Sequence, residues 1–291
     1  MHQKRFTGSL TWYYGYVDNL VMRLNVAQKI LSAYFVLLCI FWVTLHINGL
    51  KGGSWNDFYS FSFGLIPLLS GLWGIHQSFR WGGTESYVGQ ALLFISTGSF
   101  LWGTGTMIWA YYNFFAGVPI PYTSIADLFY ILTIGFWVAG MWSLSHAVGS
   151  RIGFKTTAGK VFSVLIPIGI LVASYYLLVV IGRDGTLIPT YEGYLKLILD
   201  LAYPLGDVII LTLAMLIFGL SRSYLGGTYK LPVNVLLLGF LTMYFADFIF
   251  SYTTTNGTFY TGNFGDLVFT VAMFLISFGT LGINVALADN T

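Results

Sequence analysis

Six aspartates lie within the apolar segments of this 291-residue sequence, where carboxyl groups could bind a cation or exchange a proton. They are Asp57, Asp127, Asp200, Asp207, Asp247 and Asp266. A charged side chain at the centre of a bilayer costs about 2.5–3.5 kcal/mol, so it is usually kept for a partner or a function. No lysine or arginine falls in the central part of an apolar segment. We therefore expect these carboxyl groups to be protonated, hydrogen-bonded to polar side chains, or bound to a cation.

The segments that carry these aspartates predict an all-α, polytopic transmembrane bundle. Charged residues make up 8% of the chain and hydrophobic residues 56%, whereas soluble domains carry roughly 25% charged residues. Only helices and closed barrels can span lipid, and apolar runs of about 20 residues without alternation favour helices. The predicted spans are residues 28–48, 56–78, 87–115, 122–147, 160–181, 197–220, 231–251 and 264–287.

The basic residues predict how the chain is oriented in the membrane. With the N-terminus inside, ten of the 13 Lys and Arg residues fall on the cytoplasmic side, as the positive-inside rule requires. Eight spans then place both termini in the cytoplasm of a plasma-membrane protein. We expect residues 28–291 to form one transmembrane domain and residues 1–27 to be a cytoplasmic or interfacial segment. Within it, residues 8–27 fit either a helix lying in the membrane interface or an aqueous extension of the first span.

A recurring tripeptide opens every second predicted helix with a small or polar residue, then Asp, then an apolar residue. The four instances are Asn56-Asp57-Phe58, Ala126-Asp127-Leu128, Gly206-Asp207-Val208 and Gly265-Asp266-Leu267. The pattern indicates four related helical hairpins. It also leaves a structural alternative open, because Asp in a first helical turn accepts hydrogen bonds from free backbone N–H groups.

The alternative of helix capping applies to some of the aspartates and not to others. Asp57, Asp127 and Asp266 fit helix caps, and Asp207 fits one if Pro204 restarts its helix. Asp247 lies near the outer end of an outward-running helix, where the dipole disfavours an anion. Asp200 and Asp207 are seven residues apart and share a helix face.

Other chemistries have weaker signals in the sequence. His46 and Asp57 could contribute to a metal site. Retinal is not expected, since the lysines near the spans, Lys29, Lys160, Lys196 and Lys230, all lie at span edges. A haem held by His76 and His146 is not expected because no porphyrin-sized pocket can be inferred. No phosphate-binding glycine loop or nucleophile motif is present, so we do not expect an enzyme. The net charge of +2 does not suggest nucleic-acid binding.

Two further patterns predict local structure. Small residues four apart predict helix faces that pack closely. These pairs are Ser99 with Gly103, Gly135 with Ala139, and Gly169 with Ala173. Asn256-Gly257 lies between β-prone residues and predicts a small hairpin over the acidic mouth of the bundle.

Three segments resemble a known membrane family. They are 121–130 (PYTSIADLFY), 200–207 (DLAYPLGD) and Gly265-Asp266-Leu267. They resemble the multi-span sensory domain found N-terminal to diguanylate cyclase and phosphodiesterase modules in some bacteria, over roughly residues 30–287. The resemblance implies a sensory input domain whose ligand is undefined. No output module follows the last span here, so we expect any signal to pass to a membrane or cytoplasmic partner.

The sequence thus predicts a membrane sensor or ligand-binding protein with an outward-facing acidic cavity for a metal ion, another cation or a cationic small molecule. The helices over 122–147, 197–220, 231–251 and 264–287 would build it. The candidate ligand-binding residues are Asp127, Asp200, Asp207, Asp247, Asp266 and Tyr203. A cation- or proton-coupled transporter, favoured by the hairpin repeat, and a structural membrane subunit with capping aspartates are the alternatives.

Overall fold

The computed structural model describes residues 24–118, 123–186, 194–221, 225 and 227–284, and these residues form helices and no strands. The helices are α2 (Val26–Ile47), α3 (Ser54–Arg80), α4 (Tyr87–Ala110), α5 (Ile125–Ala147), α6 (Ser150–Gly153), α7 (Thr157–Ser174), α8 (Tyr194–Ser221), α9 (Lys230–Thr255) and α10 (Phe264–Gly282). Two of them continue into π-helical segments, α4 through Tyr111–Phe115 and α7 through Tyr175–Ile181.

Within the described part of the chain, eight helices are long and apolar enough to cross a membrane. The predicted all-α bundle of eight spans is therefore confirmed. The boundaries differ most at the end of the chain, because α9 continues to Thr255 and α10 ends at Gly282. The predicted interfacial helix over residues 8–27 lies almost wholly outside the described residues, which begin at residue 24.

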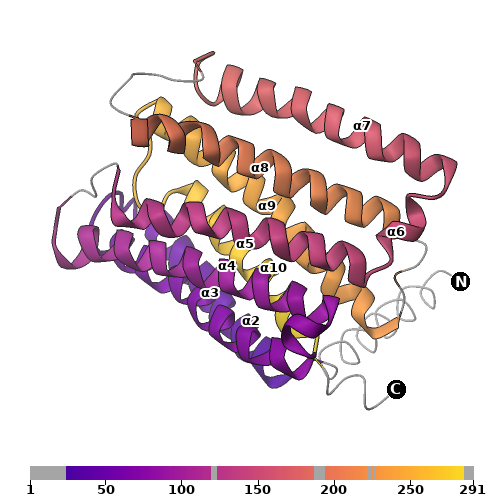
Figure 1. The fold of residues 1–291 in the computed structure, drawn as a ribbon. Helices are drawn as coiled ribbons and strands as arrows, with labels where there is room; N and C mark the ends of the chain where they lie inside the picture. The colour runs from indigo at the N-terminus through magenta and orange to yellow at the C-terminus, as the bar shows by residue number, and fades with distance from the viewer. Residues whose placement is uncertain (1–23, 119–122, 187–193, 222–224, 226, 285–291) are drawn as a thin grey trace, which may run out of the picture.

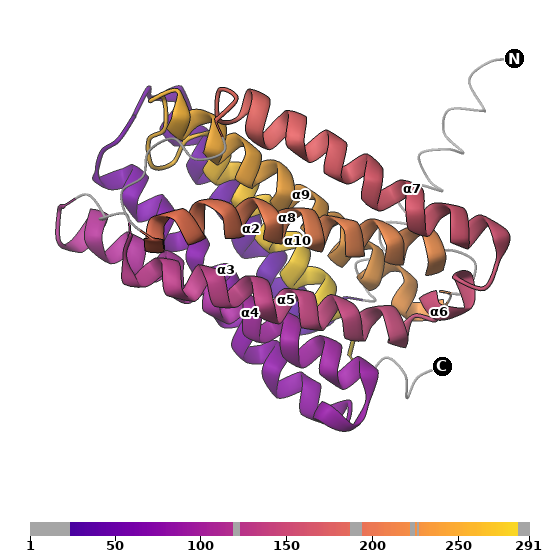
Figure 2. The ribbon, with the colours of Figure 1, turned by 45° about the horizontal axis from the view of Figure 1, so that its top comes forward.

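Six helices form a closed ring in the order α3, α4, α5, α8, α9 and α10, and each packs against the next, with α10 closing on α3. The other two long helices lie outside this ring, α2 against α3 and α10, and α7 against α8 (Figures 1 and 2). Exposed apolar side chains cover most of α2 and α7, as expected for helices with a broad lipid-facing surface.

The two ends of the ring differ in charge. We call the end at which α3, α5, α8 and α10 begin the carboxylate end, because Asp57, Asp127, Asp200 and Asp266 lie near it. We call the opposite end the basic end, because Lys29, Arg80, Lys160 and Lys230 lie near it. There the Asn25 side-chain amide, which also caps α2, donates to the Leu281 carbonyl oxygen at 2.8 Å. Which end faces the cytoplasm stays a prediction from the positive-inside rule.

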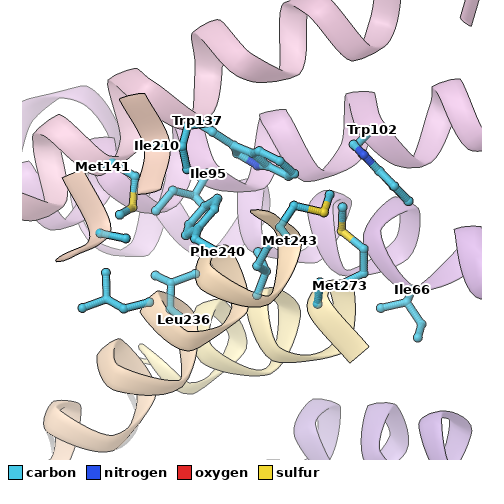
Figure 3. Packing of buried hydrophobic residues seen from close by; sticks show 14 of the residues in the cluster. Ile66, Ile95, Trp102, Trp137, Met141, Ile210, Leu236, Phe240, Met243 and Met273 are labelled. Atoms are coloured by element: carbon cyan, nitrogen blue, oxygen red, sulfur yellow. The ribbon is translucent and has the colours of Figure 1, made fainter. Parts of the chain in front are cut away.

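A layer of apolar side chains packs inside the ring, nearer its basic end than its carboxylate end (Figure 3). Ile95, Met141, Leu236, Phe240 and Ile276 make up this layer, and none is more than 1% exposed. Phe240 also packs edge-on against Trp137, with the ring centroids 5.2 Å apart. Close packing of this kind is typical of a protein interior.

Small residues bring helices together at one of the three predicted positions. A Cβ atom at Gly103 would lie 2.6 Å from the backbone nitrogen of Leu68, so α3 and α4 approach closely there, as predicted. The prediction is wrong for the other two pairs, because a Cβ atom at Gly135 or Gly169 would meet no atom within 4 Å. Spacing alone does not say whether a small face meets a neighbour.

The hairpin predicted at Asn256-Gly257 is also wrong. Residues up to Thr255 are helical, and Gly257 adopts a φ of +65° just beyond the end of α9. Gly257 N–H donates to the Thr254 carbonyl, and Thr258 N–H donates to the Thr253 carbonyl. These two bonds form a Schellman motif, so the Asn-Gly pair ends a helix rather than joining two strands.

The glycine contacts predict a difference between two variants. Gly103→Ala should destabilise the protein by about 1–3 kcal/mol, because the added methyl group overpacks the α3–α4 contact. The matched control, Gly135→Ala, adds the same methyl group on an exposed helix face and should not lower stability. Thermal unfolding of the purified variants in detergent measures both. Equal losses of stability in the two variants would contradict the close contact.

Candidate functional site

A cavity of about 440 Å³ occupies the ring between the apolar layer and the carboxylate end. On α5 its lining extends from Ser124 to Trp137, which is about 20 Å along a helix axis and over half of the ~30 Å hydrocarbon thickness of a bilayer. All six helices of the ring contribute, together with the end of the α7 segment. The charged lining residues are Asp127, Arg183, Asp200, Asp207, Asp247 and Asp266.

Asp127 is both a helix cap and a cavity residue. Its Oδ2 atom accepts from the Ser124 backbone N–H at 2.7 Å, and the Ser124 hydroxyl accepts from the Ala126 N–H. This reciprocal capping box fixes the start of α5. The other carboxylate oxygen, Oδ1, accepts a hydrogen bond from the Tyr203 hydroxyl at 2.9 Å. Asp127 therefore links α5 to α8 across the cavity.

Asp266 repeats this arrangement at the start of α10, whereas Asp57 does not. Asp266 accepts from the Gly262 N–H at 2.5 Å, and Asn263 caps the helix by accepting from the Asp266 N–H. Asp266 is 7% exposed and lines the cavity. Asp57 is not among the lining residues, and its side chain is hydrogen-bonded to Thr261. Capping and cavity lining are thus compatible for Asp127 and Asp266.

Asp207 and Asp247 lie inside helices and cannot be first-turn caps. α8 runs without interruption through Pro204, so the alternative in which Pro204 restarts the helix is wrong. The carboxyl groups of Asp207 on α8 and Asp247 on α9 both line the cavity and lie close enough to act on each other.

Pro204 leaves the backbone carbonyl oxygen of Asp200 without its helical donor, and Arg183 donates to that oxygen instead. In an α-helix the N–H of residue 204 would donate to the carbonyl of residue 200, but proline has no N–H. Arg183 Nη1 donates to this Asp200 carbonyl oxygen at 2.8 Å, and Arg183 Nε contacts the Ser251 hydroxyl oxygen at 3.4 Å. The guanidinium group is thereby held between α8 and α9, where its charge acts on Asp207.

Aromatic side chains form much of the remaining wall. They are Phe63, Trp102, Trp109, Tyr130, Trp137, Tyr203, Phe250, Phe259 and Phe269. Trp109 meets Phe250 and Phe259 edge-on at centroid distances of 6.5 and 6.4 Å, next to the Schellman motif that ends α9. Deeper in the ring, Trp102 packs against Tyr130 at 5.9 Å and Phe269 at 5.7 Å. The cavity combines carboxyl groups with aromatic faces.

The structure brings together the six residues predicted to bind a ligand, since Asp127, Asp200, Tyr203, Asp207, Asp247 and Asp266 all line this cavity. Whether they bind one stays a prediction. Sequence reasoning missed Arg183 and the aromatic wall from α3 and α4. Arg183 is one of only three Lys and Arg residues on the predicted outer side. The number of basic residues on that side does not indicate which of them lies near the carboxyl groups.

The predicted metal residues lie apart from the cavity. His46 stacks on Trp42 with ring centroids 4.3 Å apart, and neither His46 nor Asp57 is among the lining residues. The described residues hold no group of three or more His, Cys, Asp or Glu side chains placed to bind one metal ion. The metal site stays a prediction without a supporting contact.

No family model, curated protein or solved structure matches the chain significantly. Its class therefore rests on the helices themselves. Eight described helices of sufficient length and apolarity make it a multi-pass α-helical membrane protein. The resemblance to a bacterial sensory membrane domain stays an expectation from short motifs.

The contact between Asp127 and Tyr203 predicts a measurable coupling. Asp127→Ala and Tyr203→Phe should each destabilise the protein, and together they should cost about 1–2 kcal/mol less than the sum, because both remove one charge-assisted hydrogen bond. A double-mutant cycle of unfolding free energies in detergent measures this coupling. Additive losses would mean that the bond contributes nothing to stability.

Proposed function

We propose that this membrane protein is a sensory, ligand-binding protein whose cavity takes an organic cation with apolar substituents. The observation that carries the proposal is the lining of the cavity, where five carboxyl groups and nine aromatic side chains accompany one guanidinium group. A volume of about 440 Å³ lies in the ~300–1,000 Å³ range typical of small-molecule pockets.

The excess of carboxyl groups favours a positively charged ligand. Asp127 and Asp266 already accept hydrogen bonds at helix starts, where the positive end of the dipole stabilises them. Asp207 and Asp247 lie close enough to act on each other, and a ligand cation beside them would offset the repulsion between two ionised carboxylates. Deep in the membrane such a charge interaction is screened less than in water.

The aromatic wall favours an organic cation over a metal ion. Ca²⁺ and Mg²⁺ need about six oxygen ligands within 2.0–2.6 Å, and among the residues that the structure describes no group of three or more His, Cys, Asp or Glu side chains is placed to bind one metal ion. An ammonium group with alkyl substituents spreads its charge and binds over the faces of Trp, Tyr and Phe. Trp109, Tyr130 and Phe250 are available for such contacts beside the carboxyl groups.

Transport is a second candidate, favoured by another cavity at the basic end of the ring. This cavity has a volume of about 360 Å³ and is lined by apolar residues that include Trp81, Leu144 and Val233. On α9 the buried residues Leu236 and Phe240 lie between Val233, which lines this cavity, and Met243, which lines the acidic one. Passage of a cation would require these side chains to move, which favours binding and sensing over transport. Uptake of a labelled organic cation into proteoliposomes would decide for transport.

Loss of the central carboxyl pair should abolish ligand-dependent stabilisation. Tetraethylammonium at 100 times its Kd should stabilise the wild-type protein by about 2.7 kcal/mol, and Asp207→Asn combined with Asp247→Asn should remove this effect. Asp57→Asn is the matched control, because Asp57 lies at the same end but does not line the cavity. Thermal shift in detergent is the measurement. Stabilisation that survives in the double variant would contradict the proposal.

The aromatic wall predicts selectivity for organic over inorganic cations. Trp109→Leu should weaken tetraethylammonium binding about fivefold, the loss of roughly 1 kcal/mol from a cation–π contact, and should leave any K⁺ binding unchanged. Trp55→Leu serves as the control, since Trp55 is 63% exposed and lies outside the cavity. Isothermal titration calorimetry gives the affinities. An equal effect on both cations would argue against aromatic recognition.

A further inference from the structure

We infer that Arg183 is a built-in counter-charge that sets which cations the cavity accepts, favouring singly charged over doubly charged ligands. The inference rests on the proposed function, because it concerns the ligand class of the same cavity. It follows from the position of Arg183, from what holds it there and from the charges around it.

A hydrogen bond to the backbone of α8 helps to fix the position of Arg183. Proline at 204 removes the helical donor to the Asp200 carbonyl, and the Arg183 guanidinium supplies the replacement at 2.8 Å. A buried carbonyl without a donor is costly in a membrane, so the missing N–H favours this one location for the guanidinium. The contact with the Ser251 hydroxyl on α9 orients it further.

Arg183 approaches the cavity from outside the ring of six helices. It follows the π-helical segment Tyr175–Ile181 at the end of α7, and its N–H still donates to the Val179 carbonyl. Leu178 from the same segment also lines the cavity. The peripheral helix α7 therefore contributes one charge and one apolar contact to a site that the ring would otherwise form alone.

The charge balance of the lining gives Arg183 its effect. It is the one basic residue among the described lining residues, against five carboxyl groups, and its charge acts on Asp207. A ligand cation placed near Asp207 and Asp247 is attracted by them and repelled by Arg183. The repulsion energy rises with the ligand charge, so it is larger for a dication. Arg183 thus lowers the affinity for dications more than for monocations.

The test compares tetraethylammonium with hexamethonium, a doubly charged bis-quaternary ammonium ion, by calorimetry on the purified full chain. Arg183→Gln should raise tetraethylammonium affinity on the order of 10-fold and hexamethonium affinity by a larger factor, since the second ammonium group is also repelled by the guanidinium group, though more weakly at its greater distance. Arg183→Lys retains the charge and should keep the wild-type ratio of the two affinities. Loss of a structural contact alone would change both affinities by the same factor.

The variant Pro204→Ala tests the same role without changing Arg183 itself. Alanine restores the N–H that the Asp200 carbonyl accepts in a regular helix, so Arg183 loses one of its contacts and its repulsion of a bound cation weakens. The affinity for hexamethonium should rise relative to tetraethylammonium, by less than in Arg183→Gln. This variant decides the question if Arg183→Gln does not fold.

The outcomes separate the two proposals. If the wild-type protein binds tetraethylammonium and neither Arg183→Gln nor Pro204→Ala changes the ratio of the two affinities, the counter-charge role is wrong and the proposed function stands. If no variant binds either cation, the proposed function itself fails. A shift of the ratio toward hexamethonium in Arg183→Gln and Pro204→Ala, but not in Arg183→Lys, supports the role of Arg183.

Discussion

Polar groups within an apolar span cannot face lipid without a large cost in free energy, and the arrangement of helices in this protein follows from that constraint. Its intramembrane aspartates lie on α3, α5, α8, α9 and α10. These five helices, with α4, form the ring. The two long helices outside the ring, α2 and α7, have no aspartate and expose many apolar side chains. The polar residues are thereby directed inward.

The same constraint operates on the backbone at a single residue. Pro204 removes one helical donor inside α8, and the Asp200 carbonyl obtains its hydrogen bond from Arg183 instead. Because of this hydrogen bond, the guanidinium group of Arg183, which comes from outside the ring, lies at the cavity. Local covalent chemistry in α8 therefore affects the electrostatics of a site formed by six other segments.

From the sequence, an aspartate at a helix start could either cap the helix or bind a ligand. In the structure, Asp127 and Asp266 can do both. Asp127 uses one oxygen for the Ser124 N–H and the other for Tyr203, while Asp266 accepts from the Gly262 N–H and still lines the cavity. A carboxylate held by a helix start keeps its orientation without a basic partner. This explains how an acidic lining can persist in the membrane with one arginine nearby.

The helices and their approximate ends were predictable from the sequence, because a span needs about 20 apolar residues and charge or turn residues end it. The shared face of Asp200 and Asp207 follows from helical periodicity, and all six predicted ligand residues do meet in one cavity. The sequence pattern of one helix did not predict whether a neighbouring helix packs against it. Gly103 meets a neighbouring helix and Gly135 does not, although their sequence contexts are alike.

Tertiary structure alone decided which residues surround the carboxyl groups. The aromatic wall from α3 and α4, and Arg183 from beyond α7, come from segments whose own periodicity does not report their neighbours. Asn256-Gly257 suits both a hairpin and a helix end, and the continuation of α9 to Thr255 selected the latter. Apolarity, length and charge determine that this chain forms helices in a membrane. The order in which those helices close into a ring is set by side-chain packing between segments distant in sequence.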